Sequence, residues 1–86
     1  MLSSVNQVKS EVLYERVFGI IRKYADYLNN TSEPLESIKA LYKEICRYPD
    51  KIILCDSDFE FGVLESTIHA YEFFIETVSQ TKQVIA

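Results

Sequence analysis

The chain has 86 residues and a formal net charge of −4, with 48% hydrophobic and 13% aromatic residues. This length suits a single domain, residues 1–86, with one modest core, and the composition excludes a disordered chain. With only 2 Gly and 2 Pro, the sequence favours helices over a sheet fold that needs many turns. The longest apolar runs span four residues, so we expect no integral membrane span and no signal peptide, and a cytoplasmic location.

The charge divides unevenly along the chain. Residues 1–47 carry seven Lys or Arg and six acids, a net of +1, whereas residues 48–86 carry two Lys and seven acids, a net of −5. This distribution argues against nucleic acid as a partner, because binding to phosphates depends on Lys and Arg. It favours another protein, one of basic charge.

The first predicted helix begins near residue 5 or, after a frayed end, near Ser10. Its apolar residues recur at helical steps in two adjoining stripes, Leu13, Val17, Ile20, Tyr24 and Tyr27, and Tyr14, Phe18, Ile21, Ala25 and Leu28. So wide an apolar face predicts contact with two neighbouring elements. Residues 29–34 follow as a polar turn.

The second helix is expected from about Pro34 to Arg47. Its apolar residues Leu35, Ile38, Tyr42 and Ile45 also recur at helical steps, and Leu41 and Cys46 widen the face. Tyr48 ends this element, because a residue before proline is biased away from helical geometry. Residues 49–56 form either a short helical turn, near residues 50–55, or an extended plug over one end of the core.

The stretch from Ser57 to Val78 gives the strongest helical pattern. Ser57 and Glu60 have the spacing of a capping box, which marks the start of a helix. The apolar residues Phe61, Leu64, Ile68, Tyr71, Ile75 and Val78 form a continuous seam. After Val78 the seam is lost, and we expect the helix to fray.

The predicted fold is therefore all-α, a small antiparallel helical bundle with three main helices plus the short segment near residues 50–55. At about 1.5 Å per residue, the first and last helices are longer than the second by roughly 10 Å. The short segment fills this difference, or a second copy or a partner covers the remaining apolar surface.

No motif in the sequence indicates catalysis, a cofactor or a metal site. Cys46 and Cys55 lie in apolar stretches, where we expect two reduced, packed thiols and not a nucleophile paired with His69. The spacing of Glu65, His69, Glu72 and Glu76 on one helical face would suit metal ligands, but the other helices supply no second histidine. We therefore predict no enzyme, no cofactor and no metal site.

The acidic residues of the second half are the candidate partner-binding surface. They lie around the last connection and along the side of the last helix that we expect opposite the seam, and they are Asp50, Asp56, Asp58, Glu60, Glu65, His69, Glu72 and Glu76. Surface acids often serve only solubility. Here Tyr48, Phe59 and Phe73 are expected among them, and aromatic residues inside a charged rim are typical of interfaces.

The order of elements over residues 11–78 resembles the small immunity proteins that neutralise nuclease bacteriocins. The segments that carry the resemblance are Thr31–Ser32–Glu33, Tyr48–Pro49 with Ile52–Cys55, and the acidic Asp56–Glu60 before the last helix. In that family an acidic second helix and a tyrosine pair in a short third helix contact the basic toxin. This chain departs from that pattern, because Ile52–Cys55 holds no tyrosine pair and the second helix carries Lys39, Lys43 and Arg47.

Two functional hypotheses follow. The first is a non-catalytic inhibitor or immunity protein that neutralises a basic toxin or enzyme through its acidic surface. The second is a homodimeric structural or regulatory adaptor that pairs through exposed helix seams.

Overall fold

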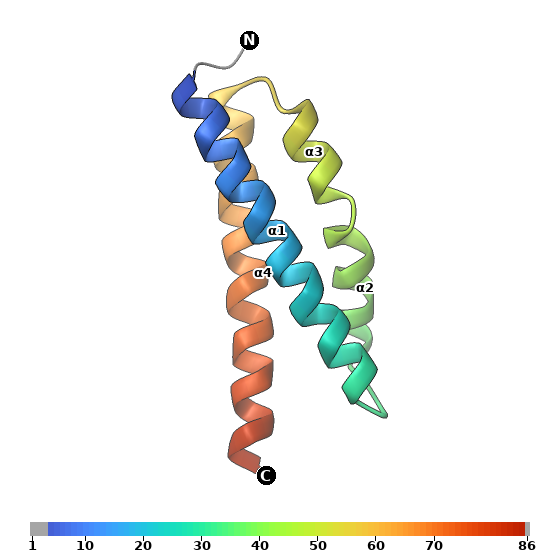
Figure 1. Ribbon diagram of the computed structural model, residues 1–86. Coiled ribbons are helices and arrows are strands. Elements are labelled where there is room, and N and C mark those ends of the chain that lie inside the picture. Colours follow the sequence, from blue (N-terminus) through green and yellow to red (C-terminus); the bar gives the residue numbers. More distant parts are fainter. Residues whose placement is uncertain (1–3, 86) are drawn as a thin grey trace.

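The computed structural model describes the backbone of residues 4–85 and the side chains of residues 8–80. Four helices follow one another along the chain, α1 (Ser4–Asn30), α2 (Glu36–Ile45), α3 (Tyr48–Leu54) and α4 (Asp58–Ile85). Figure 1 shows α1 and α4 running in the same direction, and α2 and α3 running in the opposite direction on one side of the bundle. The predicted all-α bundle with three main helices is confirmed.

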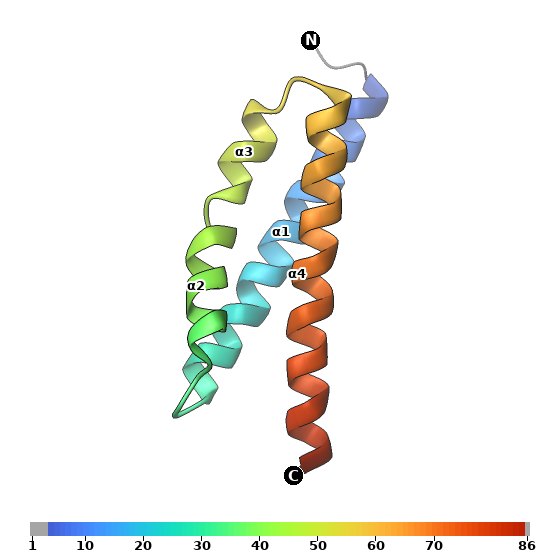
Figure 2. The ribbon, with the colours of Figure 1, turned by 180° about the vertical axis from the view of Figure 1, so that it is seen from behind.

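Helix α1 is the central element of the bundle, because it packs against α2, α3 and α4. Figures 1 and 2 show α1 crossing over the space between α4 and the α2–α3 pair. The first of its two predicted stripes supplies four buried residues, Leu13, Val17, Ile20 and Tyr24. The prediction that α1 contacts two neighbouring elements is thus confirmed.

The seam predicted for α4 is also in the core. Leu64, Ile68 and Ile75 are buried, and Phe61, Tyr71 and Val78 pack partly buried against the same cluster. Helix α2 adds Ile38 and Ile45, and α3 adds Tyr48 and Ile52. Full burial of one such side chain stabilises the fold by about 1.5–3 kcal/mol.

Tyrosine side chains connect three helices inside the core. The hydroxyl of Tyr24 in α1 donates a hydrogen bond to the backbone carbonyl of Tyr71 in α4, at 2.9 Å. The rings of Tyr71 and Tyr48 pack edge to face with their centroids 5.6 Å apart. Burial raises the pKa of Tyr24 to about 12, and burial is also the main cause that raises the pKa of Tyr71. These phenols therefore remain neutral across the physiological pH range.

The segment after α2 forms a helix and not an extended plug. Helix α3 covers Tyr48–Leu54, with Pro49 in its first turn. A proline is tolerated there because the first backbone N–H groups of a helix have no partner within the helix. Tyr48 is therefore helical itself, although α2 does end before it, at Ile45.

The helix boundaries differ from the predicted ones at several ends. Helix α1 begins at Ser4, close to the earlier of the two predicted starts, and α2 begins at Glu36 and not at Pro34. Helix α4 begins at Asp58, where the hydroxyl of Ser57 accepts a hydrogen bond from the N–H of Glu60 at 3.1 Å, as the capping box predicts. It continues past Val78 to Ile85, and the fraying expected after Val78 stays a prediction.

The two cysteines lie in different environments. Cys55 is buried, and its thiol donates a hydrogen bond to the carbonyl of Ser57 at 3.4 Å. Cys46 follows the last residue of α2 and is exposed. Both thiols are free, so the expectation of two packed thiols is right for Cys55 and wrong for Cys46.

No helix in the described residues is both long enough and apolar enough to cross a lipid bilayer.

Candidate protein-binding surface on α4

The eight predicted binding residues fall into two groups in the structure. Asp50 lies in the first turn of α3, Asp56 lies between α3 and α4, and Asp58 and Glu60 lie in the first turn of α4. The second group runs along α4 at steps of four, three and four residues, and consists of Glu65, His69, Glu72 and Glu76. Of all eight, only Glu72 is partly buried, and the others are exposed.

The second group lies beside the α1–α4 contact. The guanidinium of Arg16 in α1 binds the carboxylate of Glu72 through both oxygens, with Nη2–Oε1 at 2.7 Å and Nε–Oε2 at 3.1 Å. Lys23, two turns further along α1, lies 3.6 Å from Glu76. The expectation that this acidic face points away from the core seam is therefore wrong for Glu72 and Glu76, because both contact the helix that covers the seam.

The Arg16–Glu72 pair changes the proton affinity of both groups. The hydrogen bond from Arg16 is the main cause that lowers the pKa of Glu72, and the same hydrogen bond raises the pKa of Arg16. His69 adds a weaker contact, because its Nδ1 lies 3.9 Å from Glu72 Oε1 and attracts it only when protonated. These contacts stabilise the α1–α4 packing and leave less negative charge for a partner.

The remaining negative charge concentrates near the start of α4. Asp56, Glu60 and Glu65 form no salt bridge with any side chain in the described part of the chain. All three are exposed. Asp50 in α3 meets the same two conditions, so these four predicted acids are able to attract a basic partner over several ångströms.

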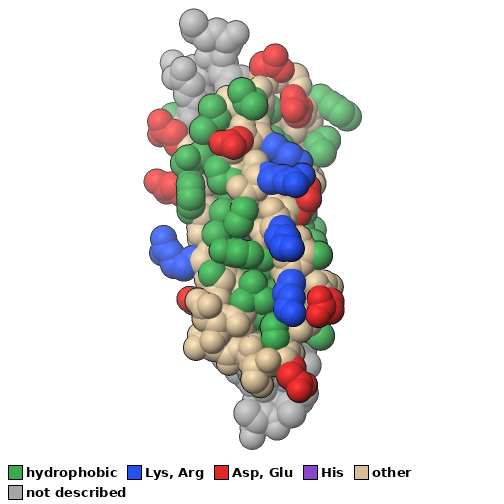
Figure 3. Space-filling model, turned by 90° about the vertical axis from the view of Figure 1, so that its right-hand side faces the viewer, with side chains coloured by type: hydrophobic (Ala, Val, Ile, Leu, Met, Phe, Trp, Pro, Cys, Tyr) green, Lys and Arg blue, Asp and Glu red, His purple; other side chains and the backbone are tan. Residues whose placement is uncertain are grey.

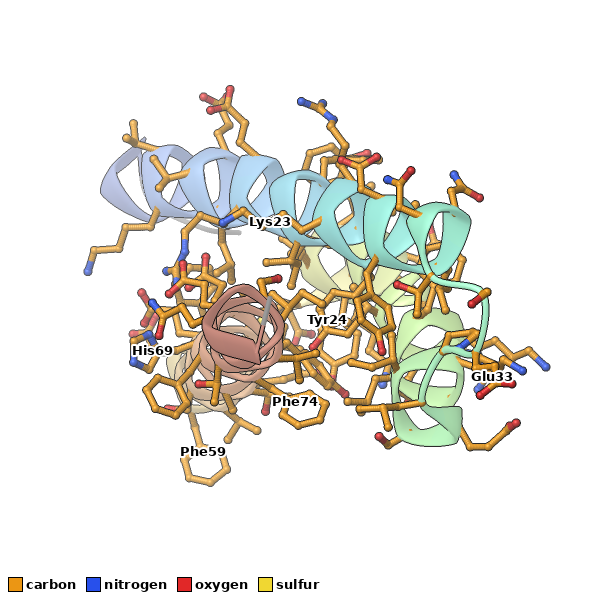
Figure 4. All side chains as sticks on the ribbon, turned by 90° about the horizontal axis from the view of Figure 1, so that it is seen from below. Lys23, Tyr24, Glu33, Phe59, His69 and Phe74 are labelled. Carbon is orange, nitrogen blue, oxygen red and sulfur yellow. The ribbon has the colours of Figure 1, made fainter. Side chains whose placement is uncertain are left out.

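The most exposed large hydrophobic side chains of α4 lie on its outer side. Phe59 is 84% exposed and Phe73 is 67% exposed, and Val63 between them is also exposed. With Ala70, these residues recur at steps of four, seven and three, so they share one side of the helix. We call Phe59, Val63, Ala70 and Phe73 the outer stripe. Figure 4 shows Phe59 projecting away from the bundle, on the side of α4 turned away from α1.

Two of the three aromatic residues expected in the binding surface are in it. Phe59 and Phe73 are exposed, but Tyr48 is buried against Tyr71 and is not available to a partner. Val63 was not identified from the sequence. Its helical spacing from Phe59 was the signal that would have placed it in the same stripe.

The core seam of α4, by contrast, packs within the chain. Leu64, Ile68 and Ile75 are buried, and Phe61, Tyr71 and Val78 are partly buried against the same core cluster. The large apolar side chains that α4 leaves exposed in the described residues are those of the outer stripe.

The described residues contain no group of three or more His, Cys, Asp or Glu side chains placed to hold a metal ion. The site is thus an exposed apolar stripe with acids on its flank, a composition suited to contact with another protein.

The chain was compared with family models, curated proteins and solved structures, and none of them matches it.

Proposed function

We propose that this chain is a non-catalytic protein-binding module that holds a basic protein against the outer side of α4. The exposure of Phe59 and Phe73 carries this proposal. Burying one exposed phenylalanine in a complex stabilises it by about 1.5–3 kcal/mol, and aromatic residues dominate the energy of many interfaces.

The acids near the stripe supply the preference for a basic partner. Asp56, Glu60 and Glu65 carry negative charge and form no salt bridge in the described chain, although Glu65 also interacts electrostatically with Arg16. Such charges raise the rate of association with a basic surface and disfavour acidic competitors.

The specific role that we propose is that of an inhibitor or immunity protein, acting in the cytoplasm on a basic toxin or enzyme. The resemblance in element order to bacteriocin immunity proteins supports this role. In this chain, however, the contact would lie on α4, because α2 is not acidic and the tyrosine of α3, Tyr48, is buried.

The proposal is tested by capture with two matched proteins, the wild type and the double variant Phe59→Ser/Phe73→Ser. We expect the wild type to retain a basic protein that the double variant does not retain. The purified partner should bind the wild type at least tenfold more tightly than it binds the double variant. Val12→Ser is the control, because Val12 is an exposed apolar residue of α1 that lies outside the outer stripe.

Salt provides the second arm of the test. Raising the salt from about 0.1 M to about 0.5 M shortens the range of electrostatic attraction and should weaken the complex. The proposal is wrong if the folded double variant binds the partner as well as the wild type does.

A further inference from the structure

A second exposed surface lies on the α2–α3 side of the bundle. It carries four basic residues at steps of four, Lys39, Lys43, Arg47 and Lys51, and all of them are exposed. Ile38 and Ile45 of α2 face the core, and helical spacing places Lys43 on the opposite, outer side. Arg47 lies in the turn between α2 and α3 and is exposed. Figure 3 shows Lys and Arg side chains in a column along this side, next to a band of hydrophobic side chains.

The middle of this basic column is not neutralised within the chain. Lys39 pairs with Glu36 at 3.3 Å and Lys51 with Glu44 at 3.8 Å. Lys43 and Arg47 make no salt bridge with the side chains that the structure describes.

Exposed apolar residues accompany the basic column, as they accompany the acids on α4. Ile53 and Leu54 of α3 are exposed beyond one end, and Leu35 is exposed at the other. We call these apolar residues and the four basic ones together the basic side. Its basic residues extend from α2 through the turn at Arg47 to Lys51 in α3, whereas the outer stripe from Phe59 to Phe73 follows about 21 Å of one helix.

We propose that the outer stripe of one copy binds the basic side of a second copy of this chain. Both surfaces have exposed apolar residues. The exposed charges that form no salt bridge are acidic beside the outer stripe, at Asp56, Glu60 and Glu65, and basic at Lys43 and Arg47 of the basic side. The proposal uses the α4 surface of the proposed function and gives it a second copy as its occupant.

The arrangement is head to tail and not symmetric. A two-fold symmetric pair through α4 would bring identical surfaces together, so the acids of one copy would face the same acids of the other. In Figure 4, α2 lies on one side of the bundle, and Phe59 and His69 project from α4 away from it. One chain therefore cannot use its own basic side to cover its own outer stripe, and successive copies would form a ring or an open chain.

The area of the two surfaces determines how strongly we expect the copies to associate. A stable interface buries about 800 Å² on each partner, which is about 13% of the 6117 Å² accessible surface of this chain. The Cα atoms extend over 48 × 21 × 17 Å, so a contact of that size would need much of one long side of the molecule. A contact along one stripe covers less, and we expect weak association that depends on concentration and salt.

The experiment is sedimentation velocity on the wild-type chain and on two surface variants. Phe59→Ser/Phe73→Ser removes the outer stripe and keeps the basic side, whereas Lys43→Glu/Arg47→Glu reverses the basic side and keeps the outer stripe. The wild type should form dimers and larger species as its concentration rises, and each variant alone should stay monomeric. An equal mixture of the two variants should form a dimer and nothing larger, because only one complementary contact remains.

Three results would overturn this proposal. The first is a wild type that is monomeric up to about 1 mM, far above the range of specific assembly. The second is a Lys43→Glu/Arg47→Glu variant that assembles like the wild type, and the third is a mixture of variants that does not dimerise. Circular dichroism establishes that each variant is folded, and the single changes Phe73→Ser and Arg47→Glu replace any double variant that is not. If the wild type is monomeric but binds a basic partner, self-assembly is refuted and the proposed function is supported. If the wild type self-assembles but binds no basic partner, the proposed function is refuted and self-assembly is supported.

Discussion

The Arg16–Glu72 pair is the strongest polar link between α1 and α4, and its contribution to stability can be predicted. The contact is bidentate, at 2.7 and 3.1 Å, and the two side chains are only 34% and 25% exposed. Hydrogen bonds to charged groups contribute about 1.5–3 kcal/mol when well shielded, and exposed ion pairs about 0.2–1 kcal/mol. For this partly exposed pair we expect Arg16→Met and Glu72→Gln each to lower the free energy of unfolding by about 1–2 kcal/mol.

A double-mutant cycle measured by urea unfolding isolates the interaction itself. We expect a coupling energy of about 1 kcal/mol between the two changes. The control is the cycle Lys23→Met with Glu76→Gln, because that pair lies at 3.6 Å with side chains 55% and 57% exposed. Its coupling should be below about 0.5 kcal/mol. A coupling for Arg16–Glu72 no larger than that of the control pair would refute the reasoning.

The contribution of Glu72 to the free energy of unfolding should decrease as the pH falls. Because the pKa of Glu72 is lower in the folded chain than in the unfolded chain, the stabilisation by its carboxylate is complete above the unfolded value of about 4.3. It is lost as the pH falls through the lower folded value. The difference in unfolding free energy between the wild type and Glu72→Gln should therefore shrink below about pH 4, and a difference that grows toward acid pH would contradict the sign.

Three further predictions concern the core and the thiols. Tyr24→Phe removes the hydrogen bond to the carbonyl of Tyr71 and should lower the free energy of unfolding by about 1 kcal/mol in urea titrations. Because burial raises the pKa of Tyr24 to about 12, its contribution is complete below pH 10 and declines between pH 10 and about 12, so Tyr24→Phe should reduce the alkaline loss of stability. Ile68→Ala empties a fully buried position at the α1–α4 contact and should cost about 2–5 kcal/mol, measured by the same titration. In thiol labelling of the native chain with a chromogenic disulfide, exposed Cys46 should react promptly, and buried Cys55 should react only after unfolding; equal rates would contradict the difference in burial.

The core could be predicted from the sequence because helical periodicity alone identifies it. Leu13 and Val17 in α1, and Leu64 and Ile68 in α4, recur at steps of four and are all buried. This inference needs no knowledge of how the helices are placed, since each continuous apolar seam must be covered by something.

The charge contacts could not be predicted in the same way. Arg16 and Glu72 are 56 residues apart, and their contact depends on the rotation and tilt of α1 against α4. The spacing of Glu65, Glu72 and Glu76 places them together on α4, but it does not determine which neighbour they meet. For the same reason the burial of Tyr48 was missed, because it depends on α3 folding back as a helix toward Tyr71.

The difference between α1 and α4 explains why the outer stripe is separate from the core. Helix α1 has neighbours on two sides and needs its wide apolar face for folding, whereas the core of α4 is supplied by Leu64, Ile68 and Ile75. Phe59 and Phe73 lie outside that contact, where a polar residue would cost the fold little, because surface substitutions usually change stability by less than about 0.5 kcal/mol. Exposed phenylalanines add no core packing here and make the surface prone to association. Binding, to a second copy or to a basic partner, is the role that we propose for them.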